Sequence, residues 1–169
     1  ITAYLSPKIA LRVLVLSLLP ALSFGQAASS FDAAQLLAPA KDSWPTYHGD
    51  YSGQRHSSLT QITPDNVGSL ALAWAFQTGQ PQSIKGVPLL VDGLMYVTVT
   101  DNLWALDART GRQLWRYRHP ENSGFHIGQR GVAVAGDLVY LTTPDARLLA
   151  FNRFTGVPAW DVAIADYTR

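Results

Sequence analysis

Cysteine is absent from the 169 residues of this chain, so disulfides and thiolate metal sites are both excluded. Charge is scarce too, because 15% of the residues are charged, against about 25% in an average domain. The 13 basic and 12 acidic side chains give a formal net charge of +1. That balance leaves no basic field for nucleic acid or for an anionic membrane surface.

A long hydrophobic run is also missing. The apolar stretch Val13–Leu22 is shorter than the roughly 20 residues of a membrane span, so no transmembrane anchor is expected. Lys8 and Arg12 precede this stretch and small residues follow it, which is the order typical of a secretory signal. We therefore predict a signal peptide over residues 1–26, a spacer over residues 27–42, and a periplasmic or otherwise exported protein.

Two copies of one eleven-residue pattern, A-x-[D/N]-x-x-T-G-x-x-x-W, are the most informative feature that is present. One copy covers Ala105–Trp115 and the other covers Ala150–Trp160. A repeat period in the forties that is built from short strands is the signature of β-propeller blades. The chain is therefore predicted to be all-β, with two four-stranded blades at about 87–118 and 131–164.

Each residue type in the pattern suits one place in a blade. Asp107 and Asn152 can accept hydrogen bonds from the backbone of the turn that follows, and Gly111 and Gly156 can take the positive φ that closes this turn. The tryptophan that ends each copy offers a flat face and one N–H to hold a neighbouring blade. The repeat thus predicts architecture, and it assigns both tryptophans to packing between blades rather than to ligand binding.

The repeat resembles the tryptophan-docking motif of the quinoprotein dehydrogenases, eight-bladed propeller enzymes that carry pyrroloquinoline quinone (PQQ). Further stretches are similar to this family in the same order: Trp44–Asp50, Gly53–Leu59, Ile62–Val67, Leu72–Trp74, Pro88–Tyr96 and Arg130–Ala133. The resemblance implies that residues 43–169 are the N-terminal part of a PQQ propeller of the alcohol dehydrogenase type, holding only its first two blades. Leu70–Phe76, whose apolar residues alternate, would be the strand that closes the ring against the last blade.

The resemblance also implies an activity. Family members oxidise alcohols, or sometimes sugars, and pass the electrons to a cytochrome c or a quinone. PQQ acts there with a metal ion, Ca²⁺ or a lanthanide, as Lewis acid and with an aspartate as general base. Because the family's metal ligands and this aspartate lie in later blades, they are expected beyond Arg169. No catalytic residue and no metal ligand is predicted in the present chain.

Three residues are candidates for contacts with PQQ. Arg130 matches the family arginine that donates hydrogen bonds to the quinone oxygens, a task that suits a planar guanidinium, although an arginine there can also be structural. Lys85 stands where the alcohol dehydrogenase branch has a glutamate, and it either pairs with a PQQ carboxylate or is a solvated side chain. His126 lies where many members carry two adjacent cysteines against one face of PQQ. The chain resembles a cysteine-free branch, in which Phe125 or His126 offers a flat surface or is simply structural.

Two other functions stay open at this stage. A non-catalytic PQQ-like propeller could serve as a scaffold or assembly protein of the cell envelope, and it would share the repeat but lack the residues around the cofactor. Arg130 and the segment Trp44–Leu59 favour the enzyme over this scaffold. A partial product without its own function is the third alternative, since two blades alone leave strand edges and tryptophan faces uncovered.

Overall fold

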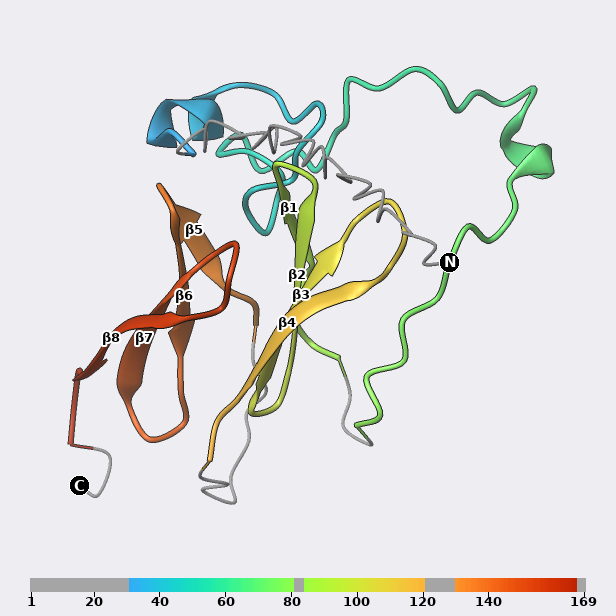
Figure 1. Ribbon diagram of the computed structural model, residues 1–169. Helices are drawn as coiled ribbons and strands as arrows, with labels where there is room; N and C mark the ends of the chain where they lie inside the picture. The colour runs from blue at the N-terminus through green and yellow to red at the C-terminus, as the bar shows by residue number, and fades with distance from the viewer. Residues whose placement is uncertain (1–30, 81–83, 121–129, 167–169) are drawn as a thin grey trace, which may run out of the picture.

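The computed structural model describes residues 31–80, 84–120 and 130–166, and these ranges contain two four-stranded antiparallel sheets (Figure 1). The first sheet consists of β1 (Leu89–Val91), β2 (Leu94–Val99), β3 (Asn102–Asp107) and β4 (Gln113–Arg118). The second consists of β5 (Ala133–Ala135), β6 (Leu138–Thr142), β7 (Arg147–Asn152) and β8 (Pro158–Ala163). In both sheets the strands lie in chain order, so the two blades predicted from the repeat are confirmed.

Within residues 31–80, 84–120 and 130–166, the helical structure consists of two short 3-10 helices, η1 (Ala33–Leu37) and η2 (Val67–Ser69). No helix in the described ranges is long and apolar enough to cross a membrane.

The turns of the two repeats have the predicted chemistry. Asp107 Oδ1 accepts hydrogen bonds from two backbone N–H groups of its turn at 2.9 and 3.2 Å, and Asn152 Oδ1 does the same at 3.1 and 3.0 Å. Gly111 and Gly156 close these turns with φ angles of 70° and 71°. The sheets also share an irregularity, a register shift directly after Ala105 in one and Ala150 in the other. The two copies of the sequence motif therefore share the same turn hydrogen bonds, nearly the same glycine φ angle and the same register shift.

The main hydrophobic core lies between the two sheets. Its buried residues are Leu89, Val91, Tyr96, Leu103, Ala105 and Trp115 from the first sheet, Val134, Val139, Leu141, Leu149 and Phe151 from the second, and Phe31 from the N-terminal segment. Trp115 connects the sheets most directly, because its Nε1 donates to the Arg153 carbonyl at 3.0 Å. A Cβ on Gly156 would lie 2.7 Å from the Trp115 ring, so only glycine permits this contact.

Leu70–Phe76, predicted as a ring-closing strand, is not a strand in the structure. A strand needs a neighbour to satisfy its backbone hydrogen bonds, and none of the strands in the described ranges pairs with this segment, so Leu72 is 83% exposed. Trp74 nevertheless packs on the first sheet as Trp115 packs on the second. Its Nε1 donates to the Ala108 carbonyl at 3.2 Å, and its ring covers Gly111.

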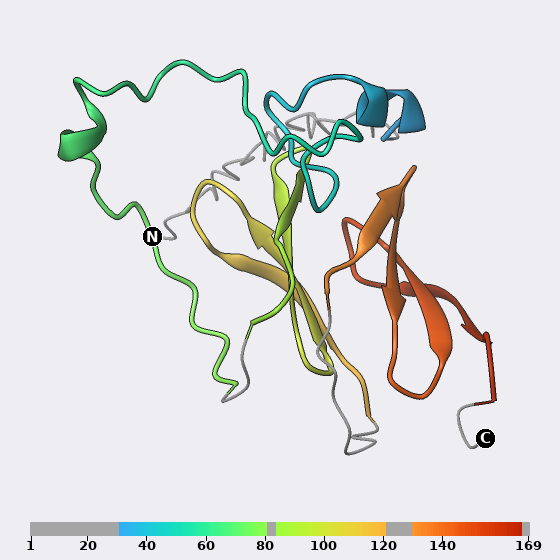
Figure 2. The same cartoon turned by 180° about the vertical axis from the view of Figure 1, so that it is seen from behind.

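The N-terminal segment lies across both sheets (Figure 2). Phe31 is buried, and its carbonyl accepts a hydrogen bond from the N–H of Gly136 at 3.0 Å. Trp44 and Leu90 exchange two backbone hydrogen bonds of 2.7 and 3.0 Å. Residues 31–42, part of the predicted spacer, thus contact the sheets from Phe31 onward.

The sheet pair has two ends, which are named here by one residue each. The Asp92 end, at the top of Figure 1, carries the N-terminal segment and the turns after β1, β3 and β7. The Arg130 end lies opposite, and it contains the residues that lead into β1 and β5, the residue after β4, and the turn between β6 and β7.

Candidate functional site

Two of the three predicted cofactor contacts lie together at the Arg130 end. Lys85 leads into β1, Arg130 leads into β5, and both residues are exposed. Their neighbours are in contact, because a Cβ on Gly86 would lie 3.2 Å from the Gly131 amide nitrogen and 3.4 Å from the Arg130 carbonyl carbon. The fold therefore brings two cationic residues from different blades to one place. His126 lies outside the described residues.

Two glycines make this approach of the backbones possible. Gly131 has a φ of 128°, and a Cβ at this position would lie 3.5 Å from the Val87 carbonyl oxygen. A Cβ on Gly86 would lie 2.6 Å from Thr98 Oγ1, a separation that real Cβ atoms do not show. Any larger residue at Gly86 would therefore push the Lys85 and Arg130 segments apart.

A buried hydroxyl lies directly behind this contact. Thr98 Oγ1 has no hydrogen-bond partner within the described part of the chain, although its side chain is buried. Leaving a buried hydroxyl unpaired costs about 1–3 kcal/mol, so such groups are uncommon in folded proteins. The Lys85–Arg130 site therefore combines two positive charges, close-packed backbone and an unused polar atom. In the same ranges no three His, Asp or Glu side chains lie together as metal ligands.

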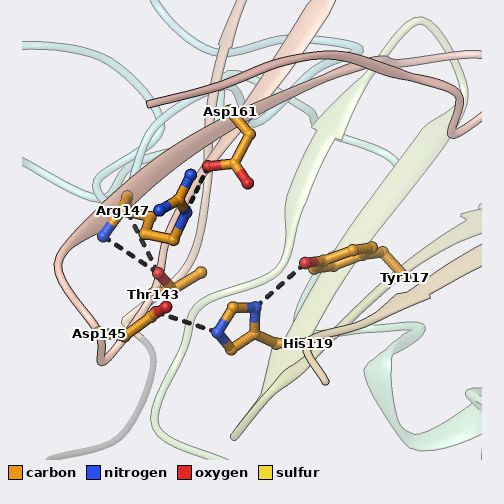
Figure 3. Close-up of polar contacts among 6 residues, drawn as sticks. All are labelled: Tyr117, His119, Thr143, Asp145, Arg147 and Asp161. Carbon is orange, nitrogen blue, oxygen red and sulfur yellow. Dashed lines mark hydrogen bonds and ion pairs between the residues drawn. The ribbon is translucent and has the colours of Figure 1, made fainter. Parts of the chain in front are cut away.

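A second polar cluster at the Arg130 end was missed by the sequence analysis (Figure 3). His119, which follows β4, is buried, and its Nε2 lies 3.0 Å from Oδ1 of buried Asp145 in the turn between β6 and β7. Its Nδ1 lies 3.1 Å from Tyr117 Oη. The backbone N–H of His119 donates to the Asp101 carbonyl at 2.7 Å. The imidazole is thus held by both sheets.

Charge around the imidazole favours an ionised Asp145. Burial raises the pKa of Asp145, but hydrogen bonds from Thr143 and from its own amide, together with His119, outweigh burial and leave the pKa below its usual range. Burial also raises the pKa of Tyr117, and the charges of Asp161 and Asp145 act in the same direction. A further ion pair within the second sheet joins Arg147 Nε to Asp161 Oδ1 at 2.7 Å.

No sequence motif marks His119, because its partner Asp145 belongs to the other blade. The repeat does place Asp101 and Asp145 in the equivalent turn of the two sheets, and this could have pointed to Asp145 as a residue of interest. A buried acid in the second of these turns needs a cation or donor from the neighbouring blade.

Comparison with known proteins agrees with the fold. The family model for PQQ, described as glucose/ethanol/alcohol dehydrogenase, beta-propeller domain, matches residues 44–165. The chain belongs to this family.

Individual members of the PQQ family show the extent of the similarity. Quinohemoprotein alcohol dehydrogenase ADH-IIG of Pseudomonas putida is 37% identical over 152 residues, which are 83% of this chain and 21% of the relative. The crystal structure of quinohemoprotein alcohol dehydrogenase from Comamonas testosteroni matches 82% of this chain with a TM-score of 0.75 and 34% identity, and the match covers 22% of that protein. A europium-containing methanol dehydrogenase matches 74% of the chain with a TM-score of 0.66 and 31% identity, over 23% of its own length. The chain spans about a fifth of these PQQ-family relatives.

Proposed function

We propose that this chain forms the first two blades of an exported PQQ-dependent dehydrogenase that oxidises an alcohol or a sugar. The observation that carries the proposal is the contact of Gly86 with Arg130 and Gly131, which places Lys85 and Arg130 side by side in a member of the PQQ family. We assign both residues to PQQ binding. His126 stays a prediction as a third contact.

The residues fit this cofactor in charge and shape. PQQ carries three carboxylates and a quinone, so a site for it needs cations and planar donors. Arg130 offers a forked set of N–H donors to adjacent oxygens, and Lys85 offers a compact charge to a carboxylate. When bound, PQQ supplies the two-electron acceptor for alcohol oxidation. The chain's own part is to hold and orient the ring.

The exposed face of the second sheet supports the proposal of further blades. Trp160 is 39% exposed, whereas its equivalent Trp115 is 8% exposed beneath the second sheet. A further repeat packed on Trp160 would give it the partners that Trp115 already has. We place the metal, Ca²⁺ or a lanthanide, and its ligands in those blades. Residues 1–26 would direct export, and a cytochrome c or a quinone would accept the electrons.

The test uses the protein expressed from its complete reading frame. After incubation with PQQ and either Ca²⁺ or a lanthanide, it should reduce an artificial dye when a primary alcohol is added. The same preparation without PQQ should be inactive. A full-length protein that does not bind PQQ would overturn the proposal and favour the non-catalytic envelope scaffold.

A further inference from the structure

At each end of the sheet pair, a basic and an acidic side chain join the two sheets. At the Asp92 end, Arg153 Nη2 of the second sheet lies 2.5 Å from Asp92 Oδ2 of the first. At the Arg130 end, His119 of the first sheet lies 3.0 Å from Asp145 of the second. Both pairs connect one sheet to the other, but only the His119–Asp145 pair lies at the end where Lys85 and Arg130 meet.

His119 is held by three contacts, one through its backbone and two through its imidazole ring. Its backbone N–H is bound to the turn between β2 and β3, through the Asp101 carbonyl. Its Nδ1 lies 3.1 Å from the Tyr117 hydroxyl, and its Nε2 lies 3.0 Å from Oδ1 of the Asp145 carboxylate. Because both side chains are buried, removing one leaves the polar group of the other without its partner in a poorly solvated place.

The Lys85–Arg130 site is built across the same junction. Lys85 and Gly86 lead into the first sheet, and Arg130 and Gly131 lead into the second. A shift of one sheet against the other at this end would change the separation of the two cations. Binding sites are sensitive to displacements of about 0.5–1 Å, so the spacing of the sheets matters for a rigid ligand that touches both.

We propose that His119 and Asp145 are positioning residues for PQQ, because the contact between their buried side chains fixes the spacing of the two blades where Lys85 and Arg130 meet. The inference rests on the proposed function, since it takes PQQ as the ligand of that site.

The test compares variants at the two ends of the full-length protein. His119→Gln and Asp145→Asn break the pair at the Arg130 end, and Asp92→Asn breaks the pair at the other end while keeping a residue type that tolerates the φ of 50° found there. Titration of the apo-protein with PQQ should show roughly tenfold weaker binding for the first two variants. Asp92→Asn should bind like the wild type, and Asp145→Glu, which keeps the carboxylate, should recover part of the loss.

Amide hydrogen exchange of the apo-protein gives a readout that needs no cofactor. Residues 84–88 and 130–134 should exchange faster in His119→Gln than in Asp92→Asn. Each variant is measured the same number of degrees below its own thermal unfolding midpoint, so that a difference in global stability does not cause the effect. Equal PQQ affinities in all variants, or equal exchange in these two segments, would overturn the positioning role. A wild-type protein that fails to bind PQQ would refute the proposed function instead, and the exchange data would still decide whether the pair fixes the junction.

Discussion

The two ends of the sheet pair use similar residues for different purposes. At the Asp92 end, glycines at the turns allow tryptophan rings to lie against the backbone, and Arg153 is fully buried beneath Phe154 and Asp92. At the Arg130 end, glycines again allow close approach, but two cationic residues there are exposed, and the Thr98 hydroxyl behind them has no partner among the described residues. Both ends thus contain glycines in close contact with a neighbouring segment. Only the Arg130 end also has exposed positive charge beside these glycines, and this charge is what marks it as a candidate binding site.

The largest expected effect is at the Asp92 end. Trp115→Ala removes a buried indole and its hydrogen bond to the Arg153 carbonyl, so we expect a loss of about 3–5 kcal/mol in the free energy of unfolding. Urea unfolding of the full-length variant measures this loss. The matched control is Arg109→Ala in the exposed turn before β4, where a change within about 0.5 kcal/mol is expected. A Trp115→Ala variant as stable as this control would contradict the packing role.

A glycine pair separates packing from backbone strain. Gly156→Ala places a Cβ 2.7 Å from the Trp115 ring at a φ of 71°, and it should cost about 2–4 kcal/mol from strain and overpacking together. Gly93→Ala has nearly the same strain, with a φ of 76°, but meets no atom within 4 Å, and it should cost about 1–2 kcal/mol. Thermal unfolding of both variants should show this order. Equal costs would mean that the contact with Trp115 contributes little.

The smallest effect is expected at the Arg130 end and depends on pH. Because the pKa of Asp145 is lowered in the folded state, ionised Asp145 stabilises the fold above its unfolded pKa of about 3.9, and this stabilisation is lost as the pH falls through the folded pKa. Asp145→Asn should therefore cost about 1 kcal/mol at pH 7 and progressively less in acid. Unfolding midpoints of wild type and variant across this pH range give the comparison. A difference that stays constant with pH would refute a stabilising role for the carboxylate charge.

The architecture could be predicted from the sequence because it repeats. Asp107 and Asn152 each begin a turn with the same hydrogen bonds, and the structure confirms both. Leu70–Phe76 forms no strand in the described ranges, where neither sheet pairs with it. Its predicted partner is the last blade of the ring, so its role as the closing strand stays a prediction. Trp74 docks on the first sheet in the way that Trp115 docks on the second. The residues before Trp74 lack the rest of the eleven-residue motif, so it was not predicted to pack in this way.

The candidate site was predictable only in part. Arg130 and Lys85 came from a resemblance to a family, since a lone arginine or lysine before a strand carries no physical signal of its own. The contact of Gly86 with Gly131 and the pairing of His119 with Asp145 cross between blades, and no local pattern encodes such distances. The isolated hydroxyl of Thr98 reads as an ordinary strand residue in the sequence and becomes unusual only when its surroundings are known.

The most direct test of the proposed PQQ site is an equilibrium titration of the full-length apo-protein with PQQ in the variants Arg130→Ala and Arg109→Ala. Both variants remove one exposed arginine and the same charge, but Arg109 lies in a turn at the Asp92 end. Arg130→Ala should bind PQQ about 10- to 100-fold more weakly than the wild type, because charge-assisted hydrogen bonds are lost, and Arg109→Ala should be unchanged. Equal affinities in the two variants would contradict the assignment of the Arg130 end as the cofactor site.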